Sequence, residues 1–194
     1  MLSTLIELQR LKSLERTGWM LRGLGACAES VAAHSYGVAV VSMLLADEII
    51  ARGAAVDVEK LLRLALLHDW AEVRVGDMPR TASEYFGAEA RRGAERAAFD
   101  DIVRACGERQ ARLYGELHED YERRASFEAR LVKAADVIDL LLQTLAFERA
   151  GARGLDEFWE DINGRYFQLD GVAGAVVSEA LQQLQEVRSE IRRA

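Results

Sequence analysis

Residues 61–72 have the sequence LLRLALLHDWAE, an apolar run that ends in a histidine and an aspartate. Glu72 follows His68 by four residues and Asp69 by three, so one face of a helix can carry all three side chains. Imidazole nitrogens and carboxylate oxygens are ligands of borderline divalent metals. The stretch therefore predicts a helix that presents a metal site at its polar end.

Two further polar residues lie in apolar stretches elsewhere. His34, one of three histidines, lies in an apolar pattern that runs from Ser30 to about Ile50. Asp136 lies within residues 126–150, which are apolar nearly all round and predict a buried central helix. A buried carboxylate is costly unless it is paired, protonated or bound to a cation. For each residue taken alone, the plain alternatives stay open: a satisfied core histidine, and a capping or salt-bridging aspartate.

Composition predicts an all-α fold, because the 194 residues contain one proline and abundant Ala, Leu, Glu and Arg. We expect a single domain over residues 1–194, a bundle of about seven to eight helices around a buried metal site. Its core covers about residues 28–150, and the terminal helices pack on it. The expected helices cover residues 2–15, 30–50, 58–74, 83–106, 108–123, 126–150 and 173–192, with a loop at 16–25 and a turn at 76–81.

Local signals refine these helices. Ser30 and Asp57 are expected N-caps of the two helices that follow them. The first helix offers one broad apolar face, made of Leu2, Leu5, Ile6, Leu8 and Leu11. The aromatic segment 155–167 is expected to pack as a lid or an interface.

Charge and targeting signals exclude some classes of protein. The net charge of −7 argues against broad contact with a nucleic-acid backbone. Cys27 and Cys106 are isolated thiols in a chain without an apolar signal block, which favours a reducing cytosol. No apolar stretch approaches the ~18 residues of a membrane span. We therefore expect a soluble cytoplasmic protein that binds neither nucleic acid polymers nor membranes.

Four short motifs resemble those of the HD-domain phosphohydrolases. They are ESVAAHS at 29–35, LHDWAE at 67–72, GDMP at 76–79 and KAAD at 133–136. Together with RTGW at 16–19 they resemble the 5'-deoxynucleotidase branch of this family, over about residues 5–168. Ala33 departs from the pattern, because relatives usually place an acidic residue before the histidine.

The resemblance implies that one divalent metal is bound by four residues, His34, His68, Asp69 and Asp136. Such a set leaves coordination positions open for water and a phosphate oxygen. It does not choose between Mn, Co, Fe, Ni and Zn. Glu72 and Asp77 are the expected catalytic residues, for proton transfer and sugar contacts. An additional Mg²⁺ near these two carboxylates stays open, because some relatives hold a second cation there.

Substrate contacts are expected from the segment before His34 and from the Gly-Asp-x-Pro turn. Arg16 and Arg22 are candidates for binding phosphate, because a guanidinium group matches its oxygens. The resemblance implies that Trp19 presses on the sugar ring, with Asp77 and Pro79 nearby. Solvated loop arginines and a packing tryptophan are the plain alternatives.

The expected activity is release of phosphate from deoxyribonucleoside 5'-monophosphates. Another nucleotide phosphohydrolase, for triphosphates or cyclic nucleotides, and a weakly catalytic nucleotide-binding regulator are the alternatives. A di-iron oxygenase is disfavoured, because it needs more histidines and the remaining one, His118, lies in a charged helix and is expected to be exposed. The family implies a homodimer, for which segment 158–167 and the final helix are candidate interfaces.

Overall fold

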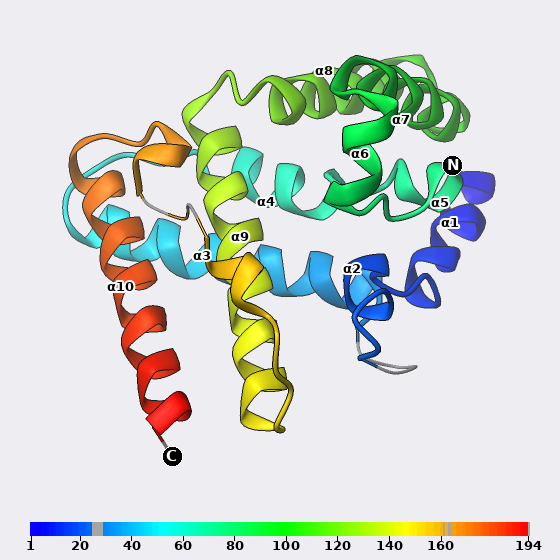
Figure 1. Cartoon of the computed structure of the whole chain (residues 1–194). Coiled ribbons are helices and arrows are strands. Elements are labelled where there is room, and N and C mark those ends of the chain that lie inside the picture. Colours follow the sequence, from blue (N-terminus) through cyan, green and yellow to red (C-terminus); the bar gives the residue numbers. More distant parts are fainter. Residues whose placement is uncertain (25–28, 161, 163, 194) are drawn as a thin grey trace. The chain divides into compact units, whose positions relative to one another are not determined.

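A computed structural model of the chain describes residues 1–24, 29–160, 162 and 164–193. Within these residues the secondary structure is helical, and the β pairing is limited to an isolated bridge between Glu15 and Ser30. The expected all-α fold is confirmed (Figure 1). Cys27 lies outside the described residues.

The chain divides into two compact units, of which the first comprises residues 1–36 and 66–123. Besides the start of α3 (Val31–Ala51), it contains α1 (Leu2–Leu8), η1 (Gln9–Lys12), α2 (Thr17–Met20), α5 (Glu72–Val75), α6 (Arg80–Phe86), α7 (Ala88–Val103), η2 (Arg104–Cys106) and α8 (Glu108–Arg123). Helix α7 packs against α8, α5 and α6 and buries Phe99 and Ile102. The contact between α5 and α7 fixes the position of α5, which follows the His-Asp pair in the chain.

The second unit comprises residues 37–65 and 124–194. It contains the rest of α3, most of α4 (Val58–Leu67), α9 (Phe127–Arg149), η3 (Asp156–Trp159), η4 (Gly164–Phe167) and α10 (Gly171–Arg193). Helices α9 and α10 lie side by side in this unit (Figure 1). Helix α9 is the predicted buried helix, and Leu131, Val132 and Ala135 are fully buried in it.

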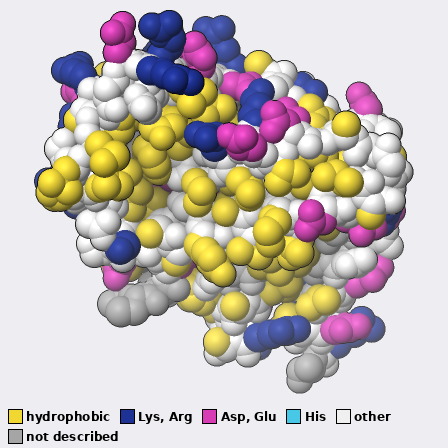
Figure 2. All heavy atoms as spheres, turned by 180° about the vertical axis from the view of Figure 1, so that it is seen from behind, with side chains coloured by type: hydrophobic (Ala, Val, Ile, Leu, Met, Phe, Trp, Pro, Cys, Tyr) yellow, Lys and Arg dark blue, Asp and Glu magenta, His cyan; other side chains and the backbone are white. Residues whose placement is uncertain are grey.

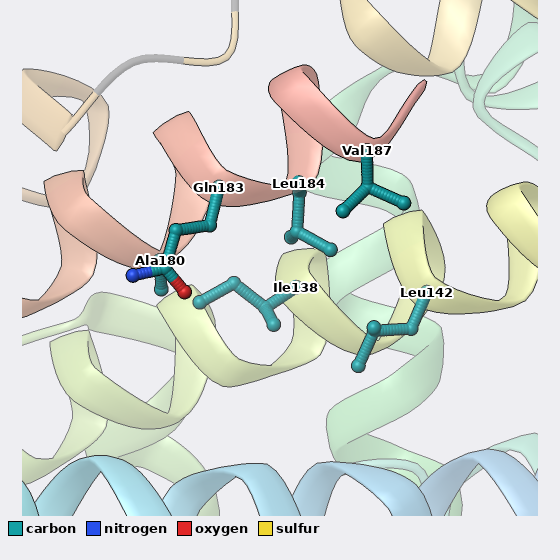
Figure 3. A pocket seen from close by; sticks show the side chains of 6 residues that line it. All are labelled: Ile138, Leu142, Ala180, Gln183, Leu184 and Val187. Carbon is teal, nitrogen blue, oxygen red and sulfur yellow. The ribbon is translucent and has the colours of Figure 1, made fainter. Parts of the chain in front are cut away.

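A hollow of about 270 Å³ lies between α9 and α10 (Figure 3). Its lining is mostly apolar and consists of Ile138, Leu142, Ala180, Gln183, Leu184 and Val187. In α10, Val176, Val177, Leu181 and Leu184 are buried. The apolar residues of α10 therefore pack mainly in the core of this unit.

The two predicted N-caps are confirmed. The Ser30 hydroxyl accepts a hydrogen bond from the Ala33 amide at 3.1 Å, at the start of α3. The Asp57 carboxylate accepts one from the Lys60 amide at 3.0 Å, at the start of α4. Both side chains satisfy amides that the first turn of a helix leaves without a backbone partner.

The N-terminal helix differs from the expectation. Helix α1 ends at Leu8 and continues as a 3₁₀ turn to Lys12, and the expected apolar face is largely exposed at Leu2, Leu5 and Ile6. Thr4 is buried instead, and its hydroxyl donates to the Ile102 carbonyl at 2.8 Å. A buried hydrogen bond to the end of α7 thus decides which side of α1 faces inward.

Three other predicted boundaries were wrong. The helix expected over 58–74 ends at Leu67 and resumes as α5 at Glu72. The helix expected over 83–106 is divided at Gly87, whose φ of +81° favours glycine, into α6 and α7. The loop expected at 16–25 contains the short helix α2. These boundaries depend on local turns and short helices, which apolar periodicity alone does not reveal.

Helix α3 is long and apolar enough, by length and composition, to cross a membrane, contrary to the expectation that no stretch approaches this length. The core helix of a globular protein passes the same test. The first turns of α3 contain His34, which is 1% exposed. Figure 2 shows no histidine on the face that it presents, and all three histidines of the chain are buried.

Candidate metal centre

The His-Asp pair lies in a tight turn between two helices of one segment. Helix α4 ends at Leu67, and the Trp70 amide then donates to the Leu67 carbonyl at 3.1 Å. The Glu72 amide donates to the Asp69 carbonyl at 3.1 Å and begins α5. The turn, rather than one straight helix, therefore presents His68, Asp69 and Glu72 together.

Two histidines converge on one oxygen of Asp69. His68 Nε2 lies 3.0 Å from Asp69 Oδ2, and His34 Nε2, from the first turn of α3, lies 3.7 Å from the same oxygen. The two imidazole rings meet edge to face, with centroids 5.5 Å apart. Two imidazole nitrogens and a carboxylate oxygen arranged in this way form a donor set that suits a divalent metal.

The environment keeps Asp69 ionised. Burial alone would raise the pKa of Asp69, but the positive charge and hydrogen bond of His68 lower it, and His34 and Arg16 lower it further. The net result is a pKa well below the usual range for an aspartate. An ionised carboxylate is the form that binds a metal.

Arg16 links two carboxylates of the site. Its Nη1 lies 3.5 Å from Asp69 Oδ2 and 3.6 Å from Asp77 Oδ1. The Thr17 amide donates to the other oxygen of Asp77 at 2.6 Å, which ties the loop after α5 to the start of α2. The segment that sequence analysis expected to bind phosphate thus lies beside the His-Asp turn.

Glu72 has the opposite electrostatic environment from Asp69, three residues away. Its side chain is buried, and Oε2 has no hydrogen-bond partner among the described residues. Burial, reinforced by the negative charges of Asp69 and Asp77, raises the pKa of Glu72 to about 10, although Arg16 opposes the shift. In the metal-free protein the raised pKa favours the protonated form of Glu72 at neutral pH, and this is the form that can donate a proton.

The remaining predicted substrate contacts lie in the same unit. Trp19 is 1% exposed, and its indole donates to Glu29 at 2.8 Å, as a packing tryptophan does. Arg22 Nη1 donates to the Gly18 carbonyl at 2.6 Å. Pro79 directly precedes α6, and its carbonyl accepts from the Ala82 amide at 2.9 Å. A direct contact of these residues with substrate stays a prediction.

Asp136, the fourth predicted ligand, belongs to the second unit. It lies in the middle of α9, and its Oδ2 is 2.6 Å from Lys133 Nζ. The side chain is 14% exposed, so the carboxylate is largely buried with a cationic partner. The expected cost of a carboxylate in this apolar helix is thereby reduced by pairing.

Several residues around the site were not predicted from the sequence. The ring centroid of Tyr121, from α8, lies 5.3 Å from that of His68. Glu95 of α7 is buried, and its Oε1 lies 2.7 Å from Arg91 Nε. Glu95 adds to the negative charge that raises the pKa of Glu72. The Arg91–Glu95 pair has i,i+4 spacing, a signal that was available in the sequence.

His118 was expected to be exposed, and this was wrong. It is 3% exposed, and its ring stacks on Phe99 with centroids 4.1 Å apart. The available signal was periodic, because Tyr114, Leu117, His118 and Tyr121 recur at the spacing of one helical face. Because α8 also contains many charged residues, this buried face was not recognised from the sequence.

Comparison with known families agrees with the geometry of the site. The HD domain family matches residues 8–173. The chain belongs to the HD-domain family. The resemblance identified from its motifs is therefore confirmed.

Relatives of this HD-domain chain match most of its length. The 5'-deoxynucleotidase YGK1 of Saccharomyces cerevisiae is 34% identical over 167 residues, which cover 80% of this chain and 71% of the yeast protein. The 5'-deoxynucleotidase HDDC2 of Homo sapiens is 31% identical over 159 residues, which cover 81% and 74% of the two chains. The crystal structure of the PH0347 protein from Pyrococcus horikoshii OT3 has a TM-score of 0.82 at 33% identity, covering 96% of this chain and 99% of that protein.

Proposed function

We propose that this HD-domain protein is a metal-dependent 5'-deoxynucleotidase, which releases phosphate from deoxyribonucleoside 5'-monophosphates. The observation that carries the proposal is the convergence of His34 and His68 on Asp69, beside the protonated carboxyl group of Glu72. The names of the relatives in yeast and human support the same activity.

The proposed metal ligands are His34, His68, Asp69 and Asp136. When bound, a divalent metal supplies a Lewis acid for the phosphate and lowers the pKa of a bound water. Mn, Co, Fe, Ni and Zn all suit a set of nitrogen and oxygen ligands. An additional Mg²⁺ would bind at Asp77 and Glu72, and it would take the place of the Glu72 proton, so the two roles of Glu72 are alternatives.

Side chains of the protein supply the proton for the leaving group and the positive charge that binds the phosphate. In the hydrolysis, the bond between phosphorus and the O5' atom breaks, and a water oxygen bonds to phosphorus. Glu72 holds a proton that the departing O5' atom takes up, and the proton that the attacking water loses restores the Glu72 carboxyl group. Arg16 and Arg22 bind phosphate oxygens, Asp77 contacts the sugar, and Trp19 and Pro79 shape the sugar site.

A substrate screen with several metals tests this proposal. Purified protein, loaded in turn with each of the five candidate metals, is assayed for phosphate release from dNMPs, NMPs and dNTPs. We expect release from dNMPs, and none from a His68→Ala variant. Absence of release from every dNMP under all metals, with the variant indistinguishable from wild type, contradicts the proposal.

The role of Asp136 is tested separately. We expect Asp136→Ala to lose most bound metal and all turnover, because it removes a ligand. Asp139→Ala, one turn further along α9, is the matched control and is expected to keep its metal. Asp139 packs where Gly37 of α3 leaves room for it, since a Cβ atom at Gly37 would collide with its carboxylate. Equal metal content in wild type and Asp136→Ala would show a structural carboxylate.

We further propose that the protein acts in the cytoplasm as a homodimer that binds neither membranes nor nucleic acid polymers. The apolar hollow between α9 and α10, whose lining includes the exposed Leu142, supports a contact surface in the second unit. Light scattering at micromolar concentration tests the dimer, and a monomer mass would reject it.

A further inference from the structure

We propose that Lys133 binds the substrate phosphate once a metal occupies Asp136, and that in the metal-free protein the same lysine neutralises this carboxylate. The inference rests on the proposed function. It assigns a phosphate-binding role to Lys133, which begins the KAAD motif at 133–136 but was not among the predicted substrate contacts.

Lys133 and Asp136 form a close, partly buried pair on α9. Lys133 Nζ donates to Asp136 Oδ2 at 2.6 Å, across the i,i+3 spacing of one helical turn. The lysine side chain is 25% exposed and the aspartate 14%. The helix positions between and beside them, Val132, Ala134 and Ala135, are fully buried. The pair is thus a polar site in a part of α9 whose neighbouring positions are buried and apolar.

Charge balance predicts what happens when a metal binds. The lysine and the aspartate together are neutral, so a divalent cation held by Asp136 leaves an excess of positive charge at this site. The Lys133 ammonium group then shares its counter-ion with the metal, and a second anion next to it becomes favourable. A phosphate monoester dianion is such an anion, and it is the group that the metal binds in the proposed reaction.

The side chain of Lys133 suits this exchange. A lysine is a compact point charge on a flexible four-carbon stem, so its ammonium group can move by a few ångströms without any change in the backbone. Within the described residues, Asp136 is the ion-pair partner of Lys133, and no second carboxylate competes for it. Lys133 therefore depends on Asp136 for its counter-charge.

A second basic residue is already engaged nearby. Arg124 donates to the Tyr166 hydroxyl at 3.3 Å and lies over its ring. Burial and the negative charge of Asp136 would raise the pKa of Tyr166, but the hydrogen bond from Arg124 and the positive charges of Arg124 and Lys133 lower it. The phenol thus senses the Lys133 charge, and Arg124 has a partner of its own. Lys133 is the cation that metal binding affects.

The test compares Lys133→Met, Lys133→Arg and the control Lys60→Met in the full chain. Methionine keeps the length of the stem and removes the charge. Lys60 lies in the same unit, and its Nζ lies 3.9 Å from Oε2 of Glu128, a carboxylate that is not a proposed ligand. Binding of Mn²⁺ is measured first by titration of metal-free protein. Binding of inorganic phosphate to the Mn²⁺-loaded protein is then measured by calorimetry.

We expect Lys133→Met to bind Mn²⁺ as tightly as wild type or more tightly, because the competing cation is gone. Its phosphate affinity should fall about 10- to 100-fold, the worth of one charged hydrogen bond. With a deoxyribonucleoside 5'-monophosphate, KM should rise more than kcat falls. Lys133→Arg should recover most of the phosphate affinity, and Lys60→Met should match wild type in both titrations.

Two results overturn the proposal. A parallel loss of Mn²⁺ affinity, by about 10- to 100-fold, would make Lys133 a residue that orients the ligand Asp136. Unchanged phosphate affinity would make the pair purely structural. If Lys133→Met does not fold, Lys133→Gln serves the same comparison, and failure of both to fold also assigns a structural role. Phosphate release by wild type is scored separately, so failure of the proposed function is distinguishable.

Discussion

Two regions of the first unit each bury a histidine, and they use it differently. In the His-Asp turn, His68 Nε2 lies 3.0 Å from an ionised carboxylate, and a second imidazole approaches the same oxygen. In the contact between α7 and α8, His118 stacks on Phe99, and burial lowers the pKa of its imidazole to about 4. Burial alone therefore does not identify a metal ligand. What distinguishes the proposed ligand His68 is the carboxylate of Asp69 that faces its ring nitrogen.

The same contrast appears within the turn itself. Asp69 and Glu72 are acidic residues three positions apart, yet the pKa of Asp69 is lowered and that of Glu72 is raised. Asp69 faces His68, His34 and Arg16, whereas burial and like charges dominate around Glu72. Neighbours of opposite and like charge give two carboxylates different chemical roles.

The largest expected effect separates the two histidines. His68→Ala should lose both bound metal and phosphate release, because it removes a proposed ligand. His118→Phe, which keeps an aromatic ring on Phe99, should keep both. Metal analysis and a phosphate-release assay on the two purified variants measure this. If His118→Phe lost its metal and His68→Ala kept it, the metal site would lie at His118 rather than at the His-Asp turn.

The next effect distinguishes proton transfer from metal binding. Glu72→Ala should keep the tightly bound metal and the fold, because the ligand set is complete without it. Turnover should fall by about 10²–10⁴, the usual contribution of a positioned acid or base. Metal content and kcat are measured on the same preparation. Loss of the metal would make Glu72 a ligand, and near-normal turnover would transfer the proton role to Asp77 or to water.

A smaller effect concerns stability. Folded metal-free protein keeps the Glu72 proton up to about pH 10, whereas the unfolded chain releases it near pH 4.5. The free energy of unfolding therefore falls as pH rises above about 4.5, and Glu72→Gln should remove this loss. The variant should gain on wild type by up to about 1.4 kcal/mol per pH unit between about pH 5 and pH 8. Urea unfolding at several pH values checks this, and a gain independent of pH would refute it.

The smallest effect has the opposite pH dependence and comes from His118. Unfolded protein protonates this histidine near pH 6.5, whereas the folded protein resists protonation down to about pH 4. The free energy of unfolding of wild type should therefore fall as pH drops below about 6.5, by at most about 1.4 kcal/mol per pH unit. His118→Phe should show a flatter curve over this range. Thermal or urea unfolding between about pH 4.5 and pH 7 compares the two proteins, and parallel curves would contradict the buried neutral imidazole.

Local sequence was sufficient for much of the fold. Ser30 and Asp57 were recognisable as caps because a cap acts within three residues. Helix α9 follows its apolar pattern closely, since that pattern reflects burial nearly all round. The break at Leu67 and the inward side of α1 were not predictable in this way. They depend on a tight turn and on a hydrogen bond from Thr4 to a carbonyl of α7.

By itself, the sequence determined the residue types of the site, their order and the family to which the chain belongs. It also determined the all-α class, because proline is nearly absent and helical periodicity is strong. Only the tertiary structure decided that His118 is buried, that His34 and His68 meet at one oxygen of Asp69, and that Glu72 keeps its proton. The physical reason is that burial, distance and neighbouring charge belong to the packing of segments far apart in sequence, and these quantities set the pKa of a group and the atoms it can bind.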